Sequence, residues 1–416
     1  MHVRESAGLS PALRPGRCPW PQPRESDPFG SGDYRRAPVP GLPSLDRGAP
    51  KRGLYAVGDV YDQICTWDNL HLAWRKAARG KRGGEPAARF EYHLEENLVR
   101  LRHELREKTY RHGDYHSFTI HDPKRRLISA APFRDRVVHH ALCNVIEPMF
   151  ERRFIYDSYA NRAGKGTHRA LDRCQAFARR FRYVLQCDIR QFFPSIDHAI
   201  LKAILERTID DEDAIWLACR ILASGVGVLD EAYDMLWFPG DDLFAVNRPR
   251  GLPIGNLTSQ FWANCFLDPF DHFVKRQLRY AGKSPAYLRY VDDFLLFADE
   301  KAALWTWRDA LMERLAALRL TIHEGRAHPR PTTEGIPFLG FVVFPTHRRL
   351  KRRKGIAYRR RLKGLVAACE AGEIPAESVG ASLRGWMNHV RYGDTWGLRQ
   401  ALLADLPVSI RGGIGG

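Results

Sequence analysis

The chain has 416 residues, of which 44% are hydrophobic and 27% charged, so a wholly disordered, collagenous or membrane-embedded protein is excluded. The length predicts about two to three structural units. Lysine and arginine number 65 and aspartate and glutamate 48, a net charge of +17. Such a surface favours a polyanionic partner, because bound cations release counterions from a phosphate backbone. Charge alone does not separate nucleic acid from an anionic membrane.

Residues 1–50 contain ten of the 26 prolines and six glycines without apolar periodicity. We therefore predict a disordered, proline-rich tail over 1–52. The eight cysteines form no CxxC pair, which predicts reduced, mostly buried thiols rather than a zinc ribbon. No apolar run reaches the roughly 18 residues of a membrane helix, and the first residues lack a secretory signal. These features predict a cytoplasmic protein without a membrane partner.

Apolar periodicity and turn residues predict the elements of the first half of the chain. In chain order they are helices over 67–77 and 90–107, a strand–turn–strand over 119–128 with its turn at Asp122-Pro123, a helix over 136–150, a strand over 181–189, and a helix that Asp197 caps and that ends near Leu205.

The second half is predicted in the same way. Its elements are a glycine- and proline-containing loop over 251–260, a helix restarted at Asp268-Pro269, a hairpin over 287–298 with Asp292-Asp293 at its turn, a helix over 305–318, a strand over 338–344, and a basic helical remainder. Strands and helices alternate irregularly, which favours an α+β fold whose antiparallel sheet carries acids at its strand ends.

The acids at these strand ends suggest a metal site. Asp188 ends one apolar strand and Asp292-Asp293 lie at the hairpin turn. Such carboxylates suit Mg²⁺, a hard cation that also accepts phosphate oxygens and water. Two ions about 4 Å apart would activate a 3′-hydroxyl and stabilise leaving pyrophosphate. Taken alone, an Asp-Asp pair in a hairpin is more often simple turn chemistry.

The combination of motifs is more specific, because it resembles reverse transcriptases, and bacterial ones in particular. Tyr290-Val-Asp-Asp resembles their YxDD palm motif, and Asp188-Ile-Arg-Gln-Phe-Phe-Pro-Ser-Ile their first palm motif. Phe338-Leu-Gly-Phe resembles the primer-grip region, and two segments, at Arg134-Asp-Arg-Val-Val and Ser158-Tyr-Ala-Asn-Arg, resemble finger motifs. The motifs occur in family order over nearly everything beyond the tail.

This resemblance implies a right-hand polymerase fold, with fingers, a palm containing the antiparallel sheet, and a helical thumb. The implied domains are N-terminal helices and fingers over 53–180, a palm with interleaved finger helices over 181–345, and a basic helical thumb over 346–410. The implied activity is RNA-directed DNA synthesis with two Mg²⁺ ions, or Mn²⁺ in their place. Its partners would be template RNA, the cDNA primer and dNTPs.

The resemblance also assigns roles to residues of the metal and triphosphate sites. Asp188 and Asp292 would be the principal metal ligands, Asp293 would assist them, and Ile189 would offer its backbone carbonyl. Lys124 and Arg126 match finger positions that grip the incoming triphosphate, since cations there neutralise developing charge. The alternative is a solvated basic turn.

Other residues match the remainder of the nucleotide site. Phe193 matches the steric gate that crowds a ribose 2′-hydroxyl; alternatively it is a core aromatic beside Phe192, and in a strand the two rings face opposite ways. Arg326 stands where relatives carry a lysine that protonates pyrophosphate. Arginine is a poor proton donor but keeps the charge, which leaves His323 as an alternative donor.

A basic run predicts nucleic-acid contacts. Residues 348–361 contain nine arginines and lysines and no acid. The run fits the start of a thumb that holds template–primer phosphates, because phosphate contacts need only dispersed cations; the alternative is a solvated face. The predicted nucleic-acid contacts are Arg162, Arg349, Arg352, Arg353, Lys354 and Arg359.

Two further patterns are not taken as sites. Gly164-Lys-Gly-Thr superficially resembles a P-loop, but Tyr159 stands in place of the first glycine and Gly166 in place of the Ser or Thr after the lysine. His139-His140 has no matching acid or cysteine in its helix, which argues against a metal site.

The loop Gly251-Leu-Pro-Ile-Gly-Asn-Leu-Thr-Ser-Gln separates subfamilies. Group II intron and retroviral relatives usually carry glutamine at Ile254 and proline at Gln260, so these two residues and Gly255 join the predicted dNTP site. The pattern resembles reverse transcriptases of diversity-generating retroelements. Those bacterial or phage enzymes copy a repeat RNA with mutations mainly at adenines, together with a small basic accessory variability protein.

Several alternatives remain at this point. The chain ends soon after the thumb-like segment, which predicts no maturase DNA-binding region or HNH endonuclease. A defence-associated enzyme, including a protein-primed or untemplated one, or a group II intron-like enzyme could share the loop pattern. A non-catalytic RNA-binding module on the same fold is the alternative from another class.

Overall fold

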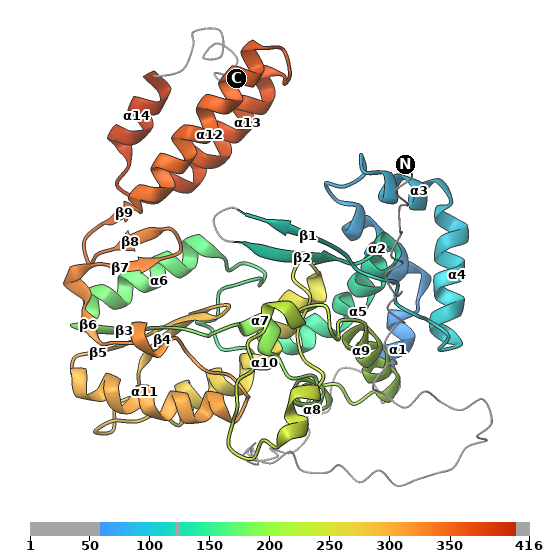
Figure 1. Cartoon of the computed structure of the whole chain (residues 1–416), viewed down its shortest axis with the longest axis horizontal. Coiled ribbons are helices and arrows are strands. Elements are labelled where there is room, and N and C mark those ends of the chain that lie inside the picture. The colour runs from blue at the N-terminus through green and yellow to red at the C-terminus, as the bar shows by residue number, and fades with distance from the viewer. Residues whose placement is uncertain (1–58, 122–124, 405–416) are drawn as a thin grey trace, which may run out of the picture. The chain divides into compact units, whose positions relative to one another are not determined.

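The computed structural model describes residues 59–121 and 125–404 (Figure 1). The predicted disordered tail, Lys124, the turn at Asp122-Pro123 and the last residues of the predicted thumb therefore lie outside the described residues. The predicted domain limits after residues 180 and 345 fall just before strands β3 and β9 and stay predictions.

The first part of the chain is helical. Its elements are α1 (Asp59–Ile64), α2 (Trp67–Ala78), α3 (Glu85–Tyr92), α4 (Leu94–Arg106) and α5 (Phe133–Glu151). The leucine stripe Leu98, Leu101 and Leu105 is buried, as its helical spacing predicts. The single helix predicted over 90–107 was wrong, because the backbone leaves the helical conformation at His93 (φ −114°, ψ 41°).

A two-stranded antiparallel hairpin, β1 (His116–Ile120) and β2 (Arg126–Ala130), lies between α4 and α5 in the sequence. Phe118 pairs with Ile128, and every residue of β1 is exposed. The strand pair predicted over 119–128 is thus confirmed, with both strands displaced by two or three residues.

The central sheet has four strands in the order β4-β5-β3-β6, and each neighbouring pair is antiparallel. The strands are β3 (Tyr183–Asp188), β4 (Ala286–Tyr290), β5 (Asp293–Ala298) and β6 (Arg330–Pro331). In the register of β3 and β5, Asp188 lies opposite Asp293. The predicted antiparallel sheet with acids at its strand ends is confirmed.

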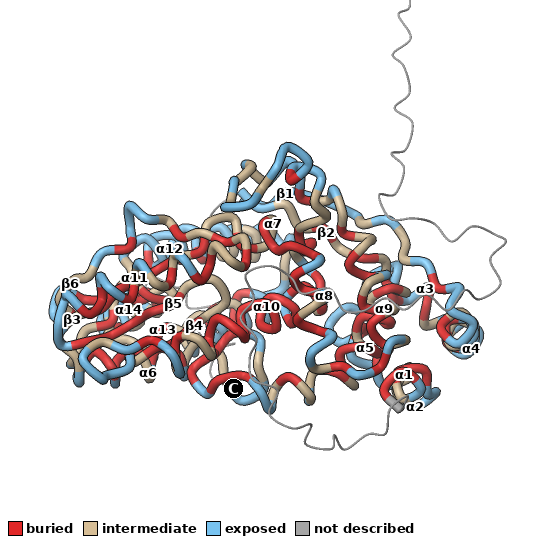
Figure 2. The backbone as a smooth tube through the Cα atoms, turned by 90° about the horizontal axis from the view of Figure 1, so that it is seen from below, coloured by how far each residue is buried: buried red, intermediate tan, exposed pale blue. Residues whose placement is uncertain are grey.

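Alternation along the strands gives this sheet two apolar faces. On one face, Val184, Leu295 and Phe297 pack with α6 (Thr167–Arg180). On the other, the Phe294 ring lies 5.3 Å from that of Phe270 in α10 (Leu257–Arg276). In Figure 1 the sheet lies between α6 and α11 (Lys301–Ala316), and Figure 2 shows that its central strands and α10 are largely buried.

Helix α10 continues without a break through Pro269, so the predicted restart at Asp268-Pro269 was wrong. A proline inside a helix removes one backbone hydrogen bond. Residues 261–271 are buried throughout, and this packing outweighs that loss. The helix also begins at Leu257, which moves Gln260 from the predicted loop into the first helical turn.

The segment after β3 contains three helices, α7 (Phe192–Ser195), α8 (His198–Glu206) and α9 (Glu212–Ser224). Asp197 caps α8, since its side chain accepts from the backbone N–H groups of Ala199 (2.9 Å) and Ile200 (3.1 Å), which confirms that prediction. Phe192 and Phe193 lie in α7, so the strand predicted for this pair was wrong.

The second sheet, ordered β7-β8-β9, replaces the single strand predicted over 338–344. It comprises β7 (Ile336–Phe338), β8 (Phe341–Val343) and β9 (Arg348–Leu350). Leu339 and Gly340 have φ of 45° and 92°, which turns the chain back after β7. Short 3₁₀ helices lie at Asp230–Ala232, Leu243–Asn247, Glu324–Arg326 and Thr332–Glu334.

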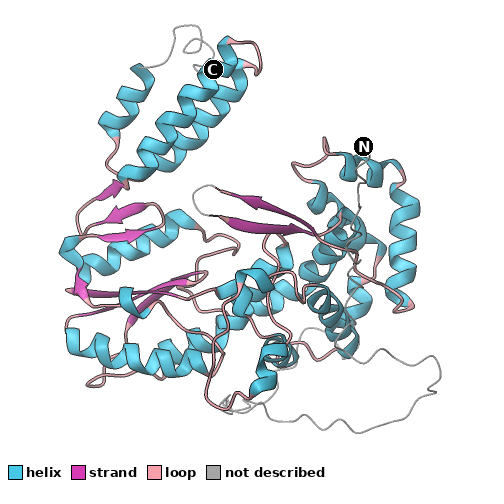
Figure 3. Cartoon of the chain, in the orientation of Figure 1, coloured by secondary structure: helices cyan, strands magenta, loops and turns pink. Residues whose placement is uncertain are grey.

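Three helices end the described chain, as the predicted helical remainder implies: α12 (Arg352–Glu370), α13 (Ala376–Val390) and α14 (Trp396–Ala404) (Figure 3). They enclose a small core around Leu362, Val379 and Leu383. The seven cysteines in the described ranges are free, and five of them are buried. Among helices in these ranges, none combines the length and apolarity needed to cross a membrane.

Candidate active site

Three aspartates meet at one end of the central sheet. Asp188 and Asp293 are cross-strand partners, so their side chains leave the same face of the sheet. Asp292 belongs to the turn between β4 and β5, and its carbonyl accepts a hydrogen bond from the Ile189 backbone N–H (3.2 Å). Strand register and this backbone bond therefore fix the YxDD-like turn against the end of β3.

The electrostatics of this cluster favour a bound cation. Burial raises the pKa of Asp293 to about 7; Asp188 and Asp292 add to the rise, and a hydrogen bond from Gln186 opposes it. Burial, with the Asp188 charge, raises the pKa of Asp292 to about 6. Desolvated carboxylates that repel one another are stabilised by a divalent cation with a preference for oxygen ligands. The donor set thus fits Mg²⁺ or Mn²⁺.

The cluster is not a complete metal cage on its own. Across residues 59–121 and 125–404, no group of three His, Cys, Asp or Glu side chains has the arrangement to hold an ion. Asp188 remains 42% exposed. Carbonyl, substrate and water oxygens would have to complete the coordination, as is usual for Mg²⁺.

Three supporting residues were missed by the sequence analysis. Gln186 donates its amide N–H to Asp293 (3.1 Å) and to the Pro337 carbonyl (3.2 Å). Arg330 in turn donates to the Gln186 amide oxygen (2.9 Å), which fixes the orientation of the amide. The charge of Lys351 lowers the pKa of Asp293. Gln186 was detectable, since a polar residue two positions before Asp188 faces the same side of the strand.

The predicted triphosphate residues are only partly described. Arg126 begins β2 and is exposed. Its charge lowers the pKa of Asp292, which places this guanidinium within electrostatic reach of the acid cluster. Lys124 lies outside the described residues. The role of both residues in dNTP binding stays a prediction.

The loop with Ile254 and Gly255 is joined to β2. The Ile254 carbonyl accepts from the Ser129 backbone N–H (2.8 Å). The Asn256 amide donates to the Ser129 carbonyl (2.8 Å) and accepts from the Ala131 N–H (3.1 Å). Gly255 has φ of 116°, and a Cβ there would lie 2.9 Å from Ile128. A side chain is excluded at this position, so the loop seats closely on the strand.

Phe193 and Gln260 flank the same loop. The Phe193 carbonyl accepts from the Leu252 backbone N–H (3.0 Å). Phe192 is buried, whereas Phe193 is only partly buried. Of the two rings, Phe193 is thus the one with access to a substrate, although its steric-gate role stays a prediction. Gln260 is exposed on the first turn of α10.

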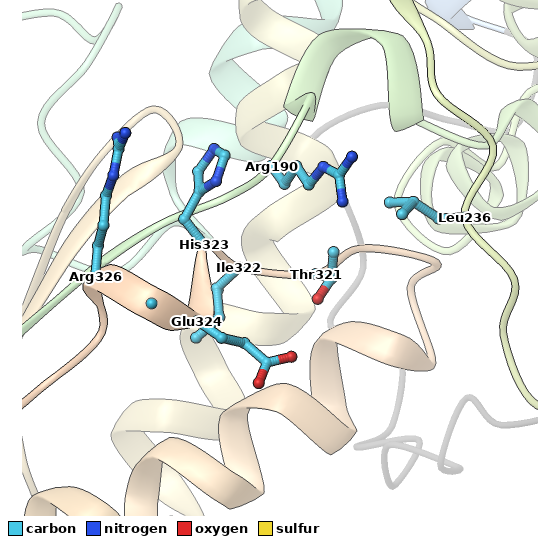
Figure 4. Close-up of a pocket in the computed structure, with 8 residues that line it drawn as sticks. Arg190, Leu236, Thr321, Ile322, His323, Glu324 and Arg326 are labelled. Carbon is cyan, nitrogen blue, oxygen red and sulfur yellow. The ribbon is translucent and has the colours of Figure 1, made fainter.

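Arg326 and His323 line a pocket of about 630 Å³ beside Asp188. The His323 backbone N–H donates to the Asp188 carbonyl (3.0 Å), and the imidazole Nε2 lies 3.9 Å from the Asp188 carboxylate. In Figure 4 the side chains of Arg326 and His323 extend in the same direction from the segment that contains the short helix Glu324–Arg326. Arg190 and Leu236 line the opposite part of the pocket.

The predicted nucleic-acid residues separate into two groups. One group is exposed on β9 and on the first turns of α12: Arg349, Arg352, Arg353, Lys354 and Arg359. Tyr358, which interrupts the basic run, is buried and stacks on Trp386 with ring centroids 4.3 Å apart. The aromatic in the run thus supports the helix packing.

Arg162 is placed differently from the prediction. Its side chain is 6% exposed and pairs with Glu151, with a shortest separation of 2.9 Å. It also donates to the carbonyls of Ile155 (2.7 Å) and Ser158 (3.0 Å). A guanidinium enclosed in this way braces the backbone and is withdrawn from phosphates, so the predicted direct contact is not supported.

The antiparallel sheet, with acids at a hairpin turn and at the adjoining strand end, defines the palm of a right-hand polymerase. Residues 120–343, more than half of the chain, match the family model described as reverse transcriptase (RNA-dependent DNA polymerase). The chain belongs to the reverse transcriptase family. Enzymes of this family use divalent metal ions.

Individual relatives match at low sequence identity. Protein YkfC of Escherichia coli (strain K12) is 24% identical over 267 residues, 55% of this chain and 64% of YkfC. Nuclear intron maturase 1 of Arabidopsis thaliana, a mitochondrial protein, is 26% identical over 95 residues, 22% of this chain and 13% of the maturase. A solved telomerase of Candida tropicalis has a TM-score of 0.40 at 12% identity and covers 57% of this chain and 55% of its own. Each match spans less than two thirds of the relative.

Proposed function

We propose that the chain is an RNA-directed DNA polymerase that makes cDNA from an RNA template by two-metal nucleotidyl transfer. The observation that carries this proposal is the pairing of Asp188 with Asp293, together with the backbone bond from Ile189 to Asp292. It gathers three carboxylates at the end of the palm sheet, in a protein of net charge +17.

Asp188 and Asp292, assisted by Asp293 and the Ile189 carbonyl, would hold two Mg²⁺ ions, or Mn²⁺, which activate the primer 3′-hydroxyl and neutralise the leaving pyrophosphate. Gln186 holds Asp293 in position from within the sheet. The cations of Lys124, Arg126 and Arg326 would neutralise the triphosphate.

The remaining predicted residues complete the proposed site. The Phe193 ring would exclude a ribose 2′-hydroxyl, with Gly255 and Gln260 shaping the loop around the nascent base pair. The exposed cations Arg349, Arg352, Arg353, Lys354 and Arg359 would hold the phosphates of the template–primer duplex.

Primer extension tests the activity. The purified chain, an RNA template and an annealed DNA primer should give Mg²⁺-dependent extension with dNTPs and much less with ribonucleotides. EDTA should abolish extension, and replacement with Mn²⁺ should restore it. Absence of extension on every RNA template and primer, with the protein folded and bound to the RNA, would favour the non-catalytic RNA-binding module instead.

The subfamily proposal concerns fidelity. The enzyme is proposed to serve a diversity-generating retroelement of a bacterium or phage, together with a small basic accessory variability protein. Ile254 supports this proposal, because its side chain offers neither a donor nor an acceptor to the nascent pair and its backbone is fixed to β2. Pairing would then be checked by shape more than by polar contact.

Sequencing of cDNA made by the native enzyme and by Ile254→Gln tests this proposal. Native errors should concentrate opposite template adenine, and the glutamine variant should reduce errors by about tenfold to a hundredfold, the value of one buried hydrogen bond. Ile254→Leu, which adds no polar group, serves as the control and should keep the native spectrum. A native error rate that is low and uniform over the four bases would contradict the subfamily.

A group II intron-like enzyme is the second candidate, because the intron maturase of Arabidopsis thaliana is among the relatives. The DNA beside the gene separates the two. Near-identical repeats that differ mainly at adenines of one copy indicate the retroelement, whereas flanking intron sequence indicates the alternative.

A further inference from the structure

A fully buried ion pair lies next to the turn between β4 and β5 that contains Asp292. It joins Arg289 of β4 to Asp271 of α10, and each side chain is 0% exposed. Arg289 binds the carboxylate through two parallel bonds, Nε to Oδ1 (2.8 Å) and Nη2 to Oδ2 (2.7 Å). The Tyr287 hydroxyl donates a third bond to Asp271 (2.6 Å). A buried pair of this kind repays its desolvation cost only when its geometry is nearly complete.

The third nitrogen of Arg289 reaches the turn itself. Nη1 donates to the Val291 carbonyl (3.0 Å) and to the Asn264 side-chain oxygen (3.1 Å). Val291 has φ of 57°, a left-handed conformation that is strained for a β-branched residue. Such a conformation persists only when its surroundings hold it in place. The guanidinium is therefore one of the contacts that hold the turn.

We propose that Arg289 is a positioning residue for nucleotidyl transfer. From its anchor on α10 it holds the carbonyl immediately before Asp292, and Asp292 in turn accepts the backbone bond from Ile189 beside Asp188. The pair thus sets the separation of the two principal carboxylates. This inference rests on the proposed polymerase function and assigns Arg289 no contact with substrate.

Two features distinguish this role from plain stabilisation. Buried ion pairs are often replaceable by apolar residues without loss of stability, so stability alone does not explain the pair. The geometry also requires arginine, because two guanidinium nitrogens bind the Asp271 carboxylate while the third donates to the Val291 carbonyl. A lysine keeps the charge for Asp271 but has a single nitrogen and cannot make the whole set.

Arg289→Lys is the test variant, and Arg173→Lys, at an arginine that is 38% exposed, is the control. Arg173 makes the same two-pronged contact with a buried aspartate, Asp157 (2.8 and 3.2 Å), but has no bond to the turn. The readouts are kcat and the dNTP KM in primer extension, the Mg²⁺ concentration for half-maximal rate, the melting temperature, and hydrogen exchange of the Ile189 amide.

For Arg289→Lys we expect kcat to fall on the order of tenfold to a hundredfold, as for a misplaced catalytic group, with the dNTP KM within about twofold. The Mg²⁺ requirement should rise, and the Ile189 amide should exchange about tenfold faster while the amides of β3 keep their protection. Arg173→Lys should show none of these changes.

Unchanged kcat and unchanged Ile189 exchange in a folded Arg289→Lys protein would overturn the proposal, and so would equal losses in both variants. If Arg289→Lys does not fold, the apolar replacement Asp271→Leu/Tyr287→Phe/Arg289→Met takes its place with the same criteria. The exchange readout needs no activity. An inactive native enzyme would therefore refute the polymerase function, while the exchange rates still decide whether Arg289 holds the turn.

Discussion

Two hairpins approach the candidate active site, and they are built in opposite ways. In β4–β5 the strands are largely buried, and the hairpin carries the aspartates. In β1–β2 every residue of β1 is exposed, and the hairpin carries Arg126. The converging acids are held by a core, whereas the cation that is proposed to meet a substrate's phosphates is accessible. The two halves of the site therefore differ in what a substitution should damage.

Removal of a carboxylate from the buried hairpin should have the largest effect. Asp292→Asn should lower templated dNTP incorporation by at least about 100-fold to 1,000-fold, because charge stabilisation at the transition state is lost. The melting temperature and RNA affinity should change little. Asp299→Asn, an exposed acid just after β5, is the control and should retain activity. Full polymerase activity of Asp292→Asn would rule out the metal-site assignment.

On the exposed hairpin, Arg126→Ala should raise the dNTP KM by about tenfold, the value of one charge-assisted contact. Its melting temperature should stay close to that of the native protein, since exposed substitutions rarely change stability. Arg125→Ala, one residue earlier and also exposed, removes the same charge as a control. Equal KM changes in both variants would indicate a general field effect and contradict a specific grip by Arg126.

The exposed cations in the first turn of α12 test whether this helix contacts nucleic acid. Changing Arg352, Arg353 and Lys354 together to glutamine should weaken primer–template binding for all sequences. The salt dependence of the binding constant should flatten by roughly 0.9 log units per log unit of salt for each lost contact. Filter binding over a series of salt concentrations measures this slope. An unchanged slope would mean that these side chains form only a solvated face.

The smallest effect concerns the pH dependence of stability that arises from the partly buried acids Asp292 and Asp293. The folded-state pKa values of Asp292 and Asp293, about 6 and about 7, lie above the ordinary value of about 4 in an unfolded chain. Folding therefore favours the protonated forms, and the stability that these two carboxyls contribute to the metal-free protein should be lost as the pH rises from about 4 to about 7. Relative to the variant Asp293→Asn, the native protein in EDTA should therefore lose a few degrees of melting temperature over this window.

The comparison with Asp293→Asn is needed because burial lowers the pKa of other groups, such as His139 and His140, which adds stability as the pH rises over the same window. Added Mg²⁺ should restore stability mainly above pH 7, where the carboxylates are ionised. A difference in melting temperature between the native protein and Asp293→Asn in EDTA that stays constant between pH 4 and 7, or grows in favour of the native protein, would contradict the raised pKa of Asp293.

Residue types and their spacing predicted those elements of the fold that depend on short-range interactions along the chain. The Asp197 cap and the hairpin with its paired acids follow from residue types and spacing, and the family motifs placed Asp188 opposite that hairpin. The continuity of α10 through Pro269 was not predictable in this way, because burial of the helix outweighs a local breaker. Gln186 was detectable by alternation, whereas Lys351 approaches Asp293 only through tertiary packing.

Arg162 shows the limit of motif reasoning in the other direction. A basic residue within a finger motif indicated a phosphate contact, yet the side chain is committed to Glu151 and two backbone carbonyls. Burial cannot be read from residue type. A charged side chain in a loop can stabilise the loop backbone by hydrogen bonds as readily as it can bind a ligand.

The Asn256 side chain joins two parts of the site that are usually considered separately. It binds the Ser129 carbonyl and the Ala131 N–H of the β2 segment, as well as the Pro253 carbonyl of its own loop. Any displacement of the hairpin that carries Arg126 must therefore carry Ile254 with it. In the proposed dNTP site, binding of the triphosphate near Arg126 and checking of the base pair near Ile254 would therefore be mechanically coupled. In a double-mutant cycle, Arg126 and Ile254 should behave as partners rather than as independent sites.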